Sequence, residues 1–162
     1  MPAFGRLLFS YTTNSIGDYV GLVALAVLVY GETGDPLATT ALFVAAQFLP
    51  AFFAPMLTAT VDQQSLRRVL PSIYATEAVV FAALALLANS FSLVPVLALT
   101  LIDGILMLTA RGLSRGAVNG VLQPHGLLRE GNGLLNVGFA AASVGGAALG
   151  GLLIDLFGIS AA

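Results

Sequence analysis

The sequence predicts an all-α integral membrane protein, built as a helical bundle with five transmembrane helices. Charged residues make up 9% of the 162 residues, whereas an ordinary soluble domain carries about 25%. Hydrophobic residues make up 58% of the chain, and its mean hydropathy is +0.97. Three runs contain no charged residue, namely 36–61, 78–102 and 131–154. Each run is long enough to cross the hydrocarbon core of a bilayer, which takes about 20 helical residues.

The composition also excludes several classes of function. A net charge of −2 offers no basic patch to nucleic acid. The absence of cysteine excludes disulfides, zinc–thiolate sites and thiol catalysis. The sequence holds neither a phosphate-binding glycine-lysine loop nor the spacing of a Ser-His-Asp triad. We therefore expect a protein that is not an enzyme, needs no cofactor or metal, and has the lipid bilayer as a partner.

The five spans follow in order from the apolar runs and the breaks between them. We predict helices at about 7–30, 38–61, 69–89, 93–113 and 132–157. A turn at 31–36 separates the first two. The run 78–102 must contain parts of two helices, because 89–92 has the composition of a turn. The fourth helix should extend past the membrane surface to about Leu122, since Pro124 cannot continue it.

The arginines set the predicted orientation. If the spans alternate in direction, all six basic residues fall on one side of the membrane: Arg6, Arg67, Arg68, Arg111, Arg115 and Arg129. The turn at 31–36, on the other side, carries Glu32 and Asp35 instead. Because arginine-rich loops stay in the cytoplasm, we expect a multi-pass protein of a bacterial inner membrane. Its N-terminus would be cytoplasmic and its C-terminus would lie outside.

Asp18 is the strongest candidate for a functional residue. It lies near the middle of the first span, and Asn14 and Tyr11 share its helix face at spacings of four and seven residues. An acid at this depth costs several kcal/mol unless it is neutral, paired or hydrated. We interpret this face as part of a cavity that binds a proton or a cation. The alternative is an acid that packs helices together by bonding to a neighbouring backbone.

Three further polar residues lie within the apolar spans. Asp103 is close to the middle of the fourth span, with Thr100 one turn earlier. We interpret Asp103 as a further residue of the proton or substrate cavity; the alternative is a bond that packs the fourth helix against the first or second. Gln47 is a lone polar residue of the second span that we expect to face the same cavity as Asp18. Glu77 lies in the third span, and we interpret it as the acceptor of a structural hydrogen bond rather than as a functional group.

Several segments together carry a family resemblance. They are Ser15-Ile16-Gly17-Asp18, Thr33-Gly34-Asp35-Pro36, Ala45-Ala46-Gln47-Phe48-Leu49-Pro50, Ala110-Arg111 and Leu127-Leu128-Arg129. The chain resembles the N-terminal half of a Major Facilitator Superfamily transporter of the bacterial drug- and siderophore-efflux type. The resemblance implies secondary active efflux of a small-molecule substrate by alternating access, coupled to protons.

The resemblance also implies roles for charged residues near the cytoplasmic side. Arg111 would bind an anionic substrate or pair with an acid during proton exchange; the alternative is an arginine that only sets topology. Asp62, Arg67 and Arg68 would form an inner loop that holds the inward-closed state; the alternative is a loop whose arginines only set the topology. The family signature places an arginine where Gln63 stands here, so this latch is expected to be weaker.

Small residues recur every four positions on the fifth span, at Gly138, Ala142, Gly146 and Gly150. This spacing lets two helix backbones approach closely, and we interpret it as a packing stripe, with a hinge as the alternative.

Transporters of the resembled family have about twelve spans in two halves. We therefore expect the chain to be a fragment that acts with further transporter helices and does not transport by itself. The alternative is a small, non-transporting membrane protein whose glycine stripe packs against a partner's helices.

Overall fold

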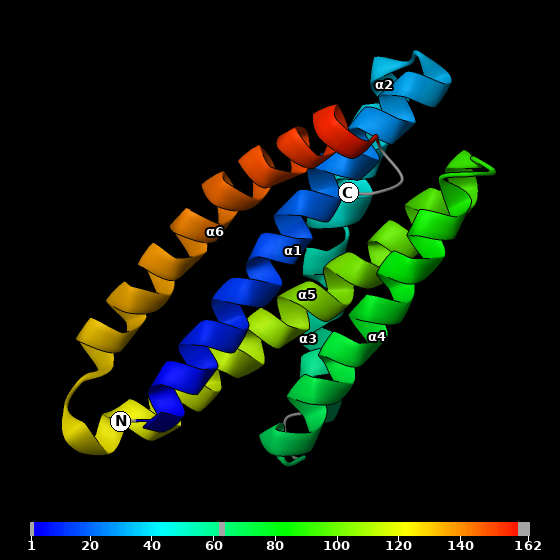
Figure 1. Cartoon of the computed structure of the whole chain (residues 1–162). Coiled ribbons are helices and arrows are strands. Elements are labelled where there is room, and N and C mark those ends of the chain that lie inside the picture. The colour runs from blue at the N-terminus through cyan, green and yellow to red at the C-terminus, as the bar shows by residue number, and fades with distance from the viewer. Residues whose placement is uncertain (1, 62–63, 159–162) are drawn as a thin grey trace.

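The protein is a bundle of long helices (Figure 1). The computed structural model describes residues 2–61 and 64–158, and all regular structure in these two segments is helical. Five helices are long and apolar enough to cross a membrane: Ala3–Thr33, Pro36–Val61, Leu66–Leu87, Leu93–His125 and Leu128–Phe157. The predicted all-α fold class is confirmed.

Four of the five spans are continuous α-helices. They are α1 (Pro2–Thr33), α4 (Leu66–Leu87), α5 (Leu93–Leu122) and α6 (Leu128–Phe157). Helix α5 ends at Leu122, the residue at which the sequence predicts its end, and Pro124 lies in the 3-10 turn η2 (Gln123–His125) that follows. Helices α1 and α6 begin four to five residues before the predicted spans, because a helix continues beyond the apolar segment that crosses the membrane.

The second span is interrupted by a π-helical turn that the sequence analysis missed. It consists of α2 (Pro36–Phe43), η1 (Val44–Phe48) and α3 (Pro50–Val61). Pro50 has no amide hydrogen, so it cannot donate to the carbonyl of Ala46, and the regular ladder breaks here. The backbone forms one wider, π-helical turn instead, in which the amide of Leu49 donates a hydrogen bond to the carbonyl of Val44, five residues earlier, at 2.9 Å. Such turns are frequent at functional sites, and this one carries Gln47.

The turn between the first two spans is fixed by local chemistry. Gly34 adopts a left-handed conformation with φ of +61°. The Asp35 carboxylate then accepts a hydrogen bond from the amide of Leu37 at 2.8 Å, and Pro36 supplies the first residue of α2. An aspartate cap followed by a proline is a strong helix start. This short turn places α1 and α2 side by side.

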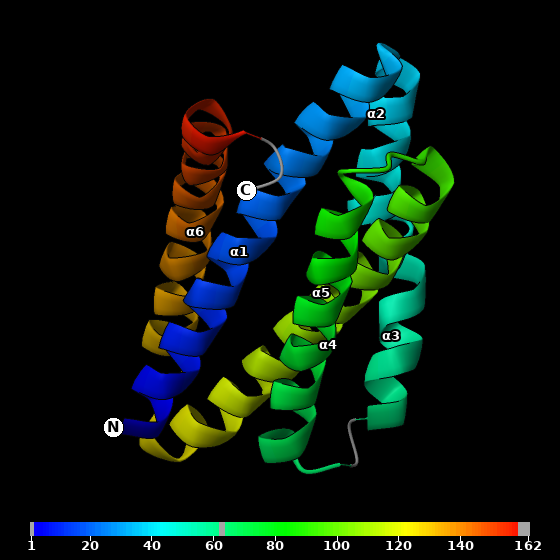
Figure 2. The same cartoon turned by 45° about the vertical axis from the view of Figure 1, so that its right-hand side comes forward.

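Helix α5 runs obliquely through the centre of the bundle (Figure 2). Helices α1, α3 and α4 each pack against α5, and α6 packs mainly against α1. Apolar clusters fill the interior toward both ends. One is built around Leu28, Leu42 and Val96, and others around Ile73 with Leu113 and around Val118 with Leu135. Buried polar side chains occupy the layer between these clusters: Asp18, Glu77 and Thr100.

Candidate functional site

An ion pair between α1 and α5 forms the centre of this polar layer. The Arg111 Nη2 atom lies 3.6 Å from the Asp18 Oδ2 atom, and the Asp18 side chain is only 6% exposed. The Asn14 side-chain amide donates to Asp18 Oδ1 at 3.4 Å. Asp18 is thus held by one group from its own helix and by one from the central helix.

Arg111 lies inside the bundle, beside Asp18, rather than at the inner end of the fourth span where the sequence analysis placed it. Helix α5 continues about three turns beyond Arg111, to the predicted end at Leu122. The guanidinium carbon of Arg111 lies 4.8 Å from the centroid of the Phe139 ring and 5.9 Å from the centroid of the Tyr19 ring. Aromatic faces attract such a cation where water is scarce. The Arg111 charge is therefore stabilised by one carboxylate and two rings.

A small cavity opens beside the ion pair. Its volume is about 40 Å³, and its polar lining comes from Asp18, Gln47, Thr100, Asp103 and Arg111. The Asp103 Oδ1 and Thr100 Oγ1 atoms are buried and have no hydrogen-bond partner in residues 2–61 and 64–158. Since one water needs about 10–15 Å³ of such space, the cavity has room for a few waters. The structure thus brings together Asp18, Asp103, Arg111 and Gln47, as the sequence analysis expected of a shared cavity.

Glu77 is a member of the site that the sequence analysis undervalued. Glu77 is only 2% exposed to solvent, and neither of its carboxyl oxygens has a hydrogen-bond partner within the described part of the chain. It lines a groove together with Asn14 and Asp18. The structural hydrogen bond that we expected for Glu77 is therefore not formed there. The signal that pointed to Asp18, an acid in the middle of an apolar span, applied equally to Glu77.

The charges of this layer do not balance. Asp18, Glu77 and Asp103 are three acids, and Arg111 is the single base that lines the cavity with two of them. Unpaired charges in an apolar interior are costly. A carboxyl that Arg111 does not neutralise is therefore stable there only if it is protonated, hydrated or paired with a cation. No group of three His, Cys, Asp or Glu residues in the described segments could hold a metal ion. Proton binding is the chemistry that these residues fit best.

Tyr11 lies outside this site, contrary to the sequence prediction. It shares the helix face of Asp18 but sits two turns away, where it packs with Val118, Leu122 and Leu135. Two turns correspond to about 11 Å along the helix, which is too far to line the same small cavity. Its buried hydroxyl has no partner among the described residues.

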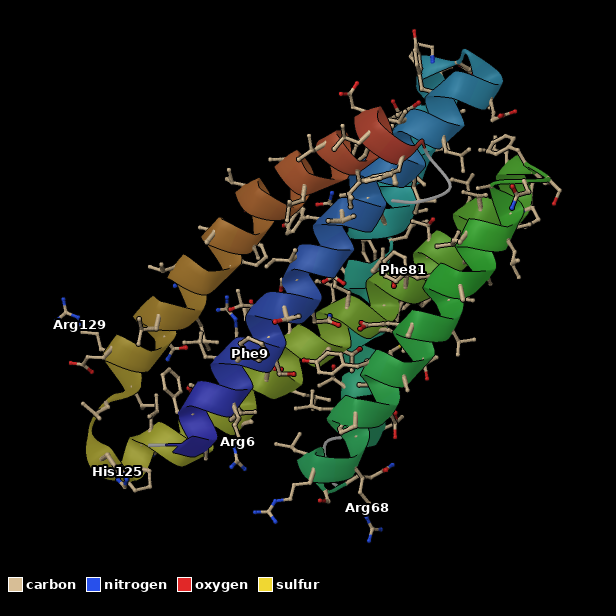
Figure 3. All side chains as sticks on the ribbon, in the orientation of Figure 1. Arg6, Phe9, Arg68, Phe81, His125 and Arg129 are labelled. Carbon is tan, nitrogen blue, oxygen red and sulfur yellow. The ribbon has the colours of Figure 1, made fainter. Side chains whose placement is uncertain are left out.

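The predicted inner loop is described only in part. Asp62 lies outside the described residues, so its place relative to the arginines is not described. Arg67 and Arg68 are exposed in the first turn of α4. Figure 3 shows Arg6, Arg68 and Arg129 toward the end of the bundle that also holds the N-terminus.

The small-residue stripe of α6 faces α1 within this chain. A Cβ atom added to Gly146 would lie 2.7 Å from the Ile16 carbonyl oxygen, and one added to Gly150 would lie 3.0 Å from the Val20 carbonyl oxygen. Ala142 is fully buried, and a Cβ on Gly138 would lie 2.7 Å from the Thr12 hydroxyl. The stripe lets the two backbones touch, and the same contact brings Phe139 to Arg111.

Comparisons with known proteins leave the site to be interpreted from its own chemistry. No family model matches the chain, and neither a curated protein nor a solved structure matches it.

Proposed function

We propose that this chain is part of a proton-coupled secondary transporter and that Asp18 and Arg111 couple proton binding to substrate movement. The observation that carries the proposal is the buried ion pair at 3.6 Å between two helices long and apolar enough to span a membrane. Ionisable residues at this depth are costly and usually mark ion or substrate pathways. Packing alone does not require such a pair, because apolar side chains of similar volume often stabilise a protein interior equally well.

The coupling follows from the electrostatics of the pair. An ionised Asp18 attracts Arg111. When Asp18 Oδ2 binds a proton, that attraction is lost, and the guanidinium is free to bind another acceptor in the cavity, such as Asp103. A small molecule and a proton that both bind to the Asp18 carboxylate cannot occupy it together. Binding of one then releases the other, which is what proton-driven efflux requires.

The proposal includes a location and partners. The basic residues Arg6, Arg68 and Arg129 lie toward one end of the bundle (Figure 3), which supports a bacterial inner membrane protein with that end in the cytoplasm. The segments that resemble the Major Facilitator Superfamily support alternating access, with further transporter helices forming the other wall of the substrate path.

The competing hypothesis of a non-transporting protein has less support. It depended on a glycine stripe that is free to pack against a partner, yet Gly138, Gly146 and Gly150 already contact α1.

Exchange of Asp18 for asparagine tests the proposed function. Asp18→Asn keeps the shape of the side chain and removes its proton exchange. In proteoliposomes that contain the complete transporter, this change should abolish efflux driven by a pH gradient while substrate binding persists. Asp155→Asn, at an exposed position of α6, is the matched control and should transport normally. Undiminished proton-driven efflux by Asp18→Asn would refute the proposal.

A further inference from the structure

We infer that Glu77 is a second proton-exchanging site and that water reaches it from the N-terminal end of the bundle through a groove between α1 and α4. Only the use of the proton rests on the proposed function. The groove and the buried carboxyl are features of the fold itself.

The groove consists of two adjoining cavities. The inner one has a volume of about 490 Å³ and is lined by Asp18 and Glu77 among others. The outer one, of about 1210 Å³, extends to Arg6 and Arg67. Ser10 and Tyr74 line both cavities, so the two lie next to each other along α1 and α4. Each is far larger than the roughly 30 Å³ that a water occupies in the liquid. The groove can therefore hold a file of waters from the bundle end to its middle.

Polar side chains mark this route along α1. Arg6, Ser10, Asn14 and Asp18 follow one another every four residues, and all four line one or both cavities. Residues four apart lie on the same face of a helix, about 6 Å apart along its axis. The spacing therefore forms a ladder of hydrogen-bonding groups from the arginine-bearing end to the ion pair. A lipid-covered groove would carry apolar residues at these positions.

Polar groups from three helices surround Glu77. Asn14 and Asp18 face the groove from α1, and Tyr74 lies one turn away on α4 itself. Asp103 and Arg111 line the neighbouring cavity from α5, and Asp18 belongs to both spaces. Both Glu77 oxygens are without a hydrogen-bond partner in the described segments. A structural acid would have such partners, whereas a group that takes up and releases protons needs unoccupied oxygens beside water.

The proposed step moves one proton and changes no other bond. A protonated Asp18 gives its proton, through the intervening water, to the ionised Glu77 carboxylate, and the ionised Asp18 again attracts Arg111. Glu77 then gives the proton to a water of the groove, which leaves as a hydrated proton. Glu77 is left ionised for the next proton.

Thiol accessibility tests the water route. The chain has no cysteine, so each single-cysteine variant reports on one position. Ala78 lines the groove, whereas its neighbour Val79 is 68% exposed on the outer surface of the helix. In membranes, a charged thiol reagent should label Ala78→Cys and Ser10→Cys at least tenfold faster than Val79→Cys. Equal rates at positions 78 and 79, or no labelling of Ser10→Cys, would overturn the route.

Infrared titration of the full chain in lipid tests the carboxyl. The absorption of protonated carboxyls should lose one pH-dependent component in Glu77→Gln and a different one in Asp18→Asn. Glu77→Asp should restore a component, and circular dichroism verifies folding of each variant. A Glu77→Gln spectrum identical to that of the unaltered chain would refute the assignment.

Neither measurement needs a substrate or transport. If the proposed function fails, transport loses its dependence on Asp18 while both results above stand. If the further inference fails, Asp18 still governs transport while Glu77 does not titrate or the groove stays closed to the reagent.

Discussion

Arg111 is the residue on which the charge balance of the interior depends. It lies 3.6 Å from Asp18 and rests on Phe139 and Tyr19. Its removal would leave a buried carboxylate without a counter-charge. Breaking one side of a buried pair costs about 3–5 kcal/mol, much more than removing both sides.

A double-mutant cycle measures this coupling. We expect Arg111→Met to lower the unfolding temperature of the detergent-solubilised chain markedly, and Arg111→Met with Asp18→Asn to recover most of the loss. Arg115→Met is the control, because Arg115 is exposed and its guanidinium donates a hydrogen bond to the Asn136 side chain at 3.2 Å. A surface contact of this kind is worth about 0–1 kcal/mol. Additive effects of the two substitutions at 18 and 111 would contradict a coupled pair.

The sequence was sufficient to identify single acids but not their partners. Asp18 could be predicted because an acid in an apolar span is costly wherever that span packs. The pairing with Arg111 depends on how α5 crosses α1, which local composition does not determine. Glu77 was undervalued because its role depends on the α1–α4 groove, which exists only once both helices pack against α5.

The contact between α1 and α6 is set by small residues. Gly146 lies so close to α1 that an added Cβ would be 2.7 Å from the Ile16 carbonyl oxygen. The adjacent Gly145 has nothing within 4 Å of such a Cβ. The two glycines therefore differ in packing while they share helix, depth and propensity.

This pair of glycines gives a matched test of the packing stripe. Gly146→Leu should push α6 away from α1 and destabilise the fold by about 1–3 kcal/mol, the usual cost of overpacking. Gly145→Leu should be neutral or slightly stabilising, because leucine favours a helix more than glycine does. Chemical unfolding in mild detergent measures both. If the two variants were equally stable, the stripe would not be a packing surface.

The sequence predicted where the helices lie along the chain better than it predicted irregular turns within them. The ends of α5 and the capped turn before α2 follow from local chemistry, namely Pro124, Asp35 and Pro36. The π-helical turn could not be predicted in this way, because its largely apolar sequence is also typical of an unbroken helix. Pro50 could have indicated it, since a proline within a helix must release the carbonyl four residues earlier.

The two ends of the bundle differ in charge. The α1–α2 and α4–α5 turns lie at one end, while the start of α4 and the α5–α6 connection lie at the other with the N-terminus (Figures 1 and 2). This second end also carries the exposed arginines (Figure 3). The fold class was predictable from the sequence because the scarcity of charge and the length of the apolar runs are global properties.

Reporter fusions test the orientation of the bundle. Fusions after Ser65 and His125 should be active only with a cytoplasmic reporter, because their segments lie at the arginine-bearing end. Fusions after Gly34 and Ser90 should be active only with a periplasmic one. Neighbouring turns that report from the same side would contradict the topology.

The depth of the ion pair has an electrical consequence. Asp18 lies near the middle of α1, so under the proposed function a proton that reaches it has crossed about half of the membrane voltage. At 100 mV this half is worth ~1.2 kcal/mol, which is roughly a sevenfold change in occupancy. With Asp18 ionised the pair is neutral, and with Asp18 protonated it carries one positive charge midway across the field. An inside-negative voltage therefore favours loading of Asp18 from the outer side and opposes its release outward, even when the pH is the same on both sides.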